Sequence, residues 1–177
     1  MRQNVLMAVA CIMLVLSAFG QDEPKPTVSN DPLTDDQIAI YRTVLNDFVP
    51  ERGLSAQLAD VTAPLVISKR AQCANTPPAN DVKPVVHRLT AAVVTGKDLP
   101  LVEPWQPPMM RHGPPNPNVP KLGMLTLSEI AFDGEHLSAT VTYDFVCGGL
   151  CGHGKAMELK KVSGEWRIDK ICLRWMY

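Results

Sequence analysis

The sequence has no excess of charge of either sign. Its 17 Lys and Arg residues nearly balance its 18 Asp and Glu residues, which gives a formal net charge of −1 over 177 residues. The longest basic run is the pair Lys160–Lys161. Nucleic acids and anionic membrane surfaces are bound through clustered Lys and Arg side chains. The sequence therefore predicts no nucleic-acid partner and no electrostatic contact with a membrane.

The motifs of common catalytic and nucleotide-binding sites are also missing. No G-x-S-x-G, H-E-x-x-H, Walker or G-x-G-x-x-G pattern occurs. Several histidines and glutamates can be considered as catalytic groups, but none has a nucleophile or a second acid at a sequence spacing typical of a catalytic site. They are His87, His112, His136, Glu51, Glu103 and Glu129. We therefore predict no catalytic residue and no cofactor, and we favour a non-enzymatic protein. A hydrolase whose site the sequence does not reveal is a further alternative.

Long apolar runs are absent apart from one at the beginning of the chain. Arg2 precedes the apolar run Val5–Phe19, and Ala18 and Gly20 place small residues at positions −3 and −1 of a cleavage site. As a helix this run spans about 22 Å, short of the roughly 30 Å of a bilayer core. We predict that residues 1–20 are a cleaved signal peptide and that the mature chain is exported, to the periplasm or outside the cell, without stable membrane insertion. An uncleaved anchor is the alternative.

Cleavage removes one cysteine, Cys11, and leaves an even number. An even number of cysteines in an exported chain predicts disulfides, here two. Four cysteines allow three connectivities, and the sequence leaves all three open. The disulfide candidates are Cys73, Cys147, Cys151 and Cys172.

The mature chain is predicted to begin with a tether and a helix. Residues 21–32 are polar and contain three prolines, so we interpret them as a flexible tether. Residues 33–177 are interpreted as a single α+β domain. The capping box Thr34-Asp35-Asp36-Gln37 is followed by apolar residues at helical spacing, and Pro50 interrupts them. These patterns predict a helix from Asp35 to Val49.

The middle of the chain gives weaker signals. Val61–Ser68 is apolar and β-branched around a proline, which favours an edge strand. Val85–Val94 fits a helix and, nearly as well, a strand. Eight prolines lie between residues 100 and 120, so a long extended loop is predicted there, with Trp105 as a candidate for an exposed contact.

The last third of the chain predicts a β-meander. Leu125 and Leu127 are out of phase with Ile130 and Phe132, which indicates a bulge in the first strand. The expected strands are Leu122–Phe132, Leu137–Cys147, Lys155–Val162 and Glu165–Trp175, with turns at Asp133-Gly134 and Ser163-Gly164. The fold class is therefore α+β, with the N-terminal helix packed on a mostly antiparallel sheet that ends in a C-terminal β-meander. Cystatin-like and NTF2-like cone folds share this arrangement, and many of them bind a ligand or partner in the concavity.

The loop Cys147–Gly154 is the one place where the sequence suggests chemistry. It contains four glycines in eight residues, which predicts a tight connection between two strands. If the Ser163-Gly164 turn pairs Val162 with Glu165, Cys172 falls opposite Lys155 and close to this loop. The favoured interpretation is structural disulfides. The alternative is a zinc site at Cys147, Cys151, His153 and Cys172, or a copper(I) site helped by Met109, Met110 and His112. A redox-active dithiol is less favoured, because the C-x₃-C pair is not at a helix N-terminus.

Two stretches of the last third resemble a known family. Gly123–Asp133 and Tyr143–Gly154, followed by Glu158–Val162 and Gly164–Trp166, resemble a family of uncharacterised exported bacterial proteins. Its pattern is a strand ending in C-G-x-L-C-G-x-G, a return strand and a G-x-W turn. That family has no assigned activity, so the resemblance implies only that the cysteines and glycines form a recurring structural unit. Together these observations predict an exported, disulfide-stabilised binding or structural module with an unknown ligand or protein partner.

Overall fold

The computed structural model describes residues 26–50, 54–66, 73, 85–104, 122–148 and 151–177. The predicted signal peptide, residues 1–20, lies outside these ranges. The elements are β1 (Thr27–Ser29), α2 (Asp35–Asp47), β2 (Ser55–Ala59), β3 (Val85–His87), β4 (Leu101–Val102), β5 (Leu122–Leu127), β6 (Ala131–Phe132), β7 (Ser138–Gly148), β8 (Cys151–Val162) and β9 (Glu165–Met176). In the described part of the chain, no helix has the length and apolar character of a membrane span.

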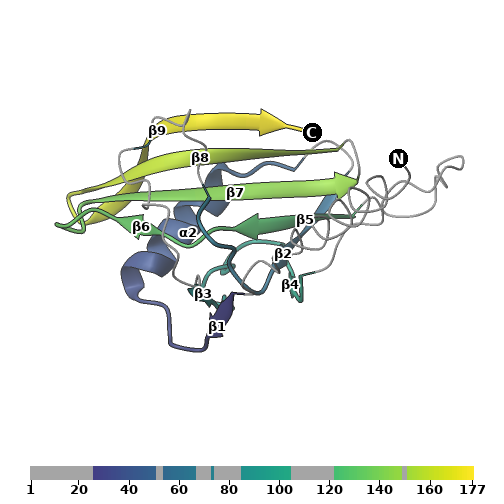
Figure 1. The fold of residues 1–177 in the computed structure, drawn as a ribbon, viewed down its shortest axis with the longest axis horizontal. Helices are drawn as coiled ribbons and strands as arrows, with labels where there is room; N and C mark the ends of the chain where they lie inside the picture. Colours follow the sequence, from purple (N-terminus) through teal and green to yellow (C-terminus); the bar gives the residue numbers. More distant parts are fainter. Residues whose placement is uncertain (1–25, 51–53, 67–72, 74–84, 105–121, 149–150) are drawn as a thin grey trace, which may run out of the picture.

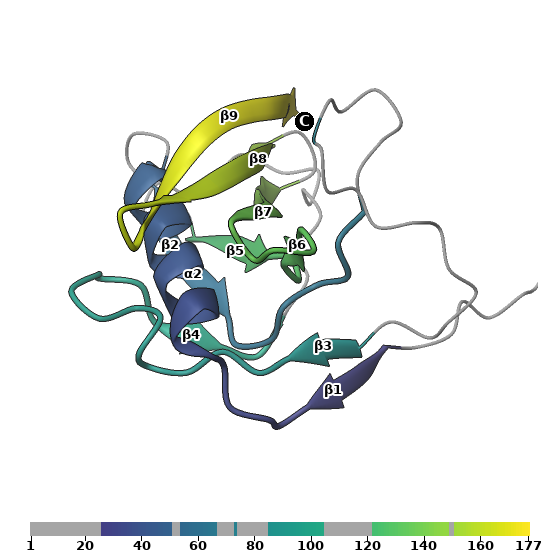
Figure 2. The same cartoon turned by 90° about the vertical axis from the view of Figure 1, so that its left-hand side faces the viewer.

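One helix packs on a mostly antiparallel sheet, as predicted (Figure 1). The main sheet has the order β4-β2-β5-β7-β8-β9, with β6 also pairing with β7, and β1 and β3 form a separate parallel pair. Figure 2 shows α2 along one face of the main sheet, with β8 and β9 curving toward it. The fold class is therefore α+β, and its C-terminal half is the predicted β7-β8-β9 meander.

Helix α2 begins at the capping box. The Gln37 amide donates to the Thr34 hydroxyl over 3.3 Å, and the Thr34 amide donates to the Gln37 side chain over 2.8 Å. These bonds satisfy amides that have no partner inside the helix. The helix ends at Asp47, two residues before the predicted Val49, because the next residue, Phe48, adopts an extended backbone. The helix buries Ile40, Tyr41, Val44 and Leu45 against the sheet.

Strand β7 shows why the sheet has one apolar face. Ala139, Val141, Tyr143 and Phe145 are at most 1% exposed and face the helix within the core. Because side chains alternate along a strand, the residues between them, such as Asp144, face the other side of the sheet. This second face carries one of the candidate sites described below.

The first predicted strand of the meander is two strands. Leu127 pairs with Tyr143, and Ala131 pairs with Thr140, so four steps on one strand match three on the other. This shift is the bulge that the phase change in the sequence predicted. The turn pairing Val162 with Glu165 is also confirmed.

The middle of the chain departs from its predictions. The expected strand Val61–Ser68 is wrong over its described part, where only Val61 and Ala63 form isolated bridges. The strand lies earlier, as β2, because it inserts in parallel between β4 and β5. The ambiguous segment Val85–Val94 is a short strand, β3, followed by turns.

Two further segments contribute short strands. Thr27–Ser29, inside the predicted tether, form β1 and pair with β3. Leu101–Val102, at the start of the proline-rich region, form β4 and pair with β2. The rest of the predicted loop, residues 105–121 with Trp105, Met109, Met110 and His112, lies outside the described residues.

Candidate functional site

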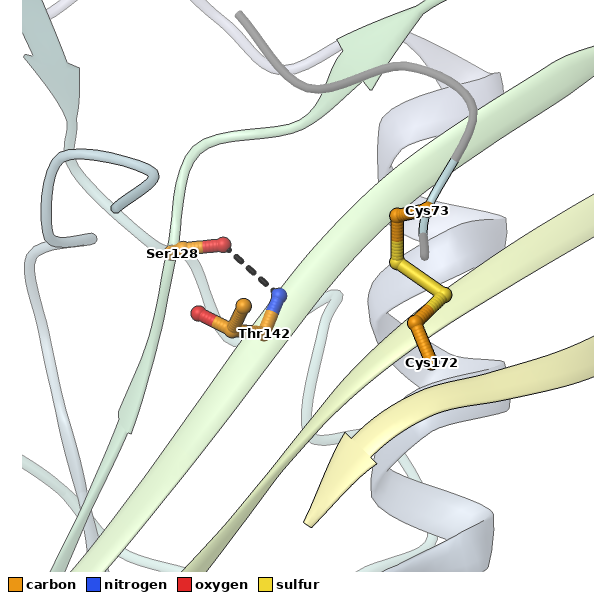
Figure 3. Close-up of a disulfide and its surroundings, with 4 residues drawn as sticks. All are labelled: Cys73, Ser128, Thr142 and Cys172. Carbon is orange, nitrogen blue, oxygen red and sulfur yellow. Dashed lines mark hydrogen bonds between the residues drawn. A yellow bond between two sulfur atoms is a disulfide. The ribbon is translucent and has the colours of Figure 1, made fainter. Parts of the chain in front are cut away.

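The four cysteines of the predicted mature chain form two disulfides. Cys73 pairs with Cys172, and Cys147 pairs with Cys151, with sequence separations of 99 and 4. Figure 3 shows the Cys73–Cys172 bond in front of the strands, with α2 behind them. The structure therefore selects one of the three connectivities that the sequence left open. Two disulfides in one domain are typical of an oxidising, extracytoplasmic environment.

The Cys147–Cys151 disulfide closes the turn between β7 and β8. Gly148 has a φ of 152°, a backbone conformation that side chains disfavour, and it pairs with Cys151. Strand β8 begins at Cys151, so the predicted loop Cys147–Gly154 is shorter than expected. Gly152 and Gly154 belong to a strand. A Cβ atom at Gly154 would meet the Trp175 side chain, and one at Gly152 would meet first the Phe145 carbonyl oxygen and then the Tyr177 ring.

The predicted convergence of Cys172 on this turn does not occur. Lys155 pairs with Arg174, which is two residues after Cys172 on β9. The difference arises because the pairing of β8 with β9 shifts twice, between Ala156 and Met157 and between Glu158 and Leu159. At each shift, one step along β8 matches two steps along β9. Counting residues one for one from the Ser163-Gly164 turn therefore gives the wrong partner for Cys172. Cys172 instead bonds Cys73.

His153 also lies away from any ligand set. Its ring packs among the aromatic residues on the helix side of the sheet, at 5.9 Å from Phe48, 5.8 Å from Tyr143 and 5.5 Å from Phe145 between ring centroids. Disulfide sulfurs are not the thiolates that bind zinc or copper(I). In the described ranges no three His, Cys, Asp or Glu side chains gather as a metal site. The alternative site at Cys147, Cys151, His153 and Cys172 is therefore not assembled.

Gly154 accommodates an indole that crosses a whole strand. Asp144 of β7, Gly154 of β8 and Trp175 of β9 are directly paired neighbours in one row of the sheet. The Trp175 Nε1–H donates to Asp144 Oδ1 over 2.9 Å, so the ring passes over the glycine to reach the carboxylate. A Cβ atom at Gly154 would overlap this ring. Glycine at this position is explained by the close approach of the indole.

Tyr177 reaches the same carboxylate beside Trp175. Its amide donates to the Gly152 carbonyl over 3.0 Å, and its hydroxyl lies 3.1 Å from Asp144 Oδ2. A Cβ atom at Gly152 would approach the Tyr177 ring within 2.8 Å. Burial, and then the negative charge of Asp144, raise the pKa of the Tyr177 phenol above its ordinary value of 10.0. We call Asp144, Trp175 and Tyr177 the aromatic platform.

A second polar cluster joins the two sheets. The His87 Nδ1 atom lies 2.9 Å from Glu129 Oε2, and both side chains are about one-fifth exposed, at 23% and 19%. The His87 amide donates to Glu129 Oε1 and to the Thr62 hydroxyl, each over 2.8 Å. The Thr62 hydroxyl also donates to Glu129 Oε1. Glu129 therefore holds both the ring and the backbone of His87.

The backbone of Glu129 is itself fixed from the helix side. The buried Tyr41 hydroxyl donates to the Ser128 carbonyl over 3.0 Å, and the Ser128 hydroxyl donates to the Glu129 carbonyl over 2.8 Å. The Thr142 amide donates to the same serine hydroxyl (Figure 3). Burial, and to a lesser extent the charge of Glu129, raise the pKa of the Tyr41 phenol well above its ordinary value.

This cluster is the arrangement that the sequence did not reveal. His87 and Glu129 are 42 residues apart, and Thr62 is 25 residues from His87, so no local spacing marks them. An imidazole held at Nδ1 by a carboxylate presents its Nε2 nitrogen on the opposite edge of the ring. This is the orientation that a carboxylate gives to a general-base histidine.

Among the described residues considered from the sequence, Trp166, His136 and Glu103 take no part in either cluster. Trp166 is 5% exposed and belongs to the core, where its indole donates to Asp36 over 2.9 Å. His136 is exposed and stacks on Phe132 at 4.8 Å between ring centroids. Glu103 is exposed, and Glu51 lies outside the described residues.

Two hollows lie near the ends of α2, away from both clusters. One, of about 350 Å³, opens beside Phe48 and Leu99, with Lys97 and Asp98 at its edge. The other, of about 550 Å³, opens at the start of α2 beside Phe132 and His136. Neither hollow includes a residue of the aromatic platform or of the His87 cluster.

Comparison with models of known protein families, with curated protein sequences and with solved structures finds no match to this chain.

Proposed function

We propose that this chain is an exported, non-enzymatic binding module stabilised by its two disulfides. The observation that carries the proposal is the pairing of all four cysteines of the predicted mature chain. Both bonds involve strands of the meander: one closes the β7-β8 turn and the other anchors β9. These strands, with Tyr177 directly after β9, carry the aromatic platform. A surface held rigid in this way loses little conformational freedom when a partner binds.

The resemblance to exported bacterial proteins supports the same proposal. Gly152 and Gly154, two glycines of the C-G-x-L-C-G-x-G pattern, lie beneath Tyr177 and Trp175. We propose that the pattern marks a hairpin built to hold side chains from a neighbouring strand flat against its backbone.

Export and oxidation can be tested together on the chain expressed with its own leader. We expect the protein in the periplasm or medium, with Gln21 as its first residue. Its intact mass should be lower by four hydrogens than that of the reduced chain, two for each disulfide. A chain lacking residues 1–20 is the matched control and should stay in the cytoplasm. A retained Met1 together with free thiols would contradict the proposal.

A second candidate function, hydrolysis, is favoured only by the His87–Glu129 pair. An oriented imidazole can accept a proton from a water that attacks an ester. The test is hydrolysis of nitrophenyl esters of several chain lengths by the oxidised protein. Turnover that falls at least a hundredfold in both His87→Asn and Glu129→Gln would establish this function and overturn the non-enzymatic proposal.

A further inference from the structure

The aromatic platform presents two rings on the side of the sheet away from α2. One face of the Trp175 indole lies against Gly154, and Tyr177, which is 57% exposed, lies against Gly152. Trp175 is itself partly exposed. We propose that this platform binds the guanidinium group of an arginine side chain on a partner peptide. The proposal names a ligand for the proposed binding function and rests on that function.

The charge of the platform favours a cation. Asp144 receives its hydrogen bonds from two neutral donors, the indole N–H and the phenol O–H. Its negative charge is therefore not neutralised by these partners. The faces of Trp and Tyr rings attract cations through their quadrupoles, and Trp does so best. A donor proton shared with a carboxylate makes the ring more electron-rich and strengthens this attraction.

Strand β8 lies between Asp144 and Trp175, and its nearest lysine, Lys155, faces the other side of the sheet. Lys155 follows Gly154 on β8, and successive side chains of a strand point to opposite faces. Its ammonium group pairs with Asp47 of α2 over 2.7 Å. Lys155 therefore does not occupy the cation position that the platform offers.

The shape of the platform favours a planar cation over a spherical one. Three ring atoms of the Trp175 indole lie over the Cβ position of Gly154, and one ring atom of Tyr177 lies near that of Gly152, so the indole forms a floor and not the wall of a cage. Quaternary ammonium groups are bound by aromatic cages that surround them. A guanidinium group is flat, weakly hydrated and stacks on an aromatic face. An arginine side chain therefore fits this surface better than a lysine or a trimethylammonium group.

The test is a titration of the full oxidised mature protein with short peptides, followed by ¹⁵N NMR. The probes are acetyl-Gly-Arg-Gly-amide and the same peptide with citrulline, which is isosteric but neutral, or with lysine. We expect the arginine peptide to shift the Trp175 indole N–H signal in a saturable way. The citrulline peptide should bind at least tenfold more weakly, and the lysine peptide severalfold more weakly.

Variants separate the platform from the rest of the molecule. Asp144→Asn and Trp175→Leu should each weaken arginine binding about tenfold. Asp169→Asn, which removes an exposed carboxylate paired with Lys160, is the matched control and should bind as the wild type does. If Trp175→Leu loses the dispersed NMR spectrum of a folded chain, Tyr177→Leu tests the exposed ring instead.

Several results would overturn the inference. Equal binding of the arginine and citrulline peptides would exclude a role for charge, and an unchanged affinity in Asp144→Asn would exclude the platform. Absence of any saturable shift at millimolar peptide would do the same. These failures leave the export and disulfide measurements untouched, so they are distinguishable from a failure of the proposed function.

Discussion

Glu129 binds His87 twice, once at the ring and once at the backbone amide. The Nδ1–Oε2 distance is 2.9 Å, and the amide lies 2.8 Å from Oε1. His87 ends β3 of the small sheet, whereas Glu129 follows β5 of the main sheet. One carboxylate therefore joins the two sheets.

Replacing this carboxylate should loosen the junction. We expect Glu129→Gln to lower the free energy of unfolding by about 1–3 kcal/mol, because a partly buried group loses a charge-assisted partner. Urea denaturation measures the change. Glu135→Gln, at an exposed turn position, is the control and should stay within about 0.5 kcal/mol of wild type. Equal losses in the two variants would show that the junction contributes nothing specific.

Adding a methyl group beneath the Trp175 indole should displace it. Gly154→Ala places a Cβ atom where the ring lies, and we expect a loss of about 1–3 kcal/mol in unfolding free energy together with altered tryptophan fluorescence. Gly134→Ala is the matched control, since a Cβ atom there meets nothing within 4 Å. A Gly154→Ala protein with wild-type stability and fluorescence would contradict the close approach.

The two disulfides should differ in their contributions to stability. By chain entropy, a loop of about 100 residues is worth about 4.7 kcal/mol and one of about five residues about 2 kcal/mol. We therefore expect Cys73→Ala with Cys172→Ala to cost more than Cys147→Ala with Cys151→Ala. Urea denaturation without reductant compares the two double variants. The reverse order would mean that native contacts around the short disulfide outweigh loop entropy.

The contribution of Asp36 should depend on pH. Hydrogen bonds from Lys161, and then from Trp166, hold the pKa of this carboxyl below its ordinary value of 3.8. A lowered folded-state pKa stabilises the fold above pH 3.8, and this stability is lost as pH falls through the folded-state value. The stability difference between wild type and Asp36→Asn should therefore be constant near neutral pH and shrink below pH 3.8.

Denaturation curves from pH 7 down to acid would measure this difference. Asp35→Asn removes the same charge from the same end of the helix and serves as the control. A difference between wild type and Asp36→Asn that grows on acidification would contradict the assigned hydrogen bonds.

Local patterns in the sequence predicted much of this fold. The capping box at Thr34 requires only residues within one helical turn, and the alternation from Ala139 to Phe145 requires only one strand. Strand β2 could not be predicted in this way. Its residues Ser55–Ala59 include no β-branched side chain, and they become a strand because β4 and β5 lie on either side.

The site was predicted less well because its geometry depends on bulges and distant pairs. The predicted pairing of Cys172 with Lys155 was wrong because the register between β8 and β9 shifts at two places. One signal was present: Trp166 and Ile168 are out of phase with Ile171, although all three pack in or against the core. An equivalent phase change in the first strand of the meander correctly predicted the bulge after Leu127. No comparable pattern links His87 with Glu129, which only the assembled sheets bring together.

The unequal spacing of the cysteines also bears on the order in which they oxidise. Cys147 and Cys151 are separated by 4 residues and meet far more often in an unfolded chain than Cys73 and Cys172, which are separated by 99. Exchange with an external disulfide, which is reduced to two thiols as the cysteine pair is oxidised, should therefore close the short pair first. Cys172 is then the one remaining partner for Cys73 among the four cysteines. The sequence spacing of the cysteines thus disfavours the two non-native pairings.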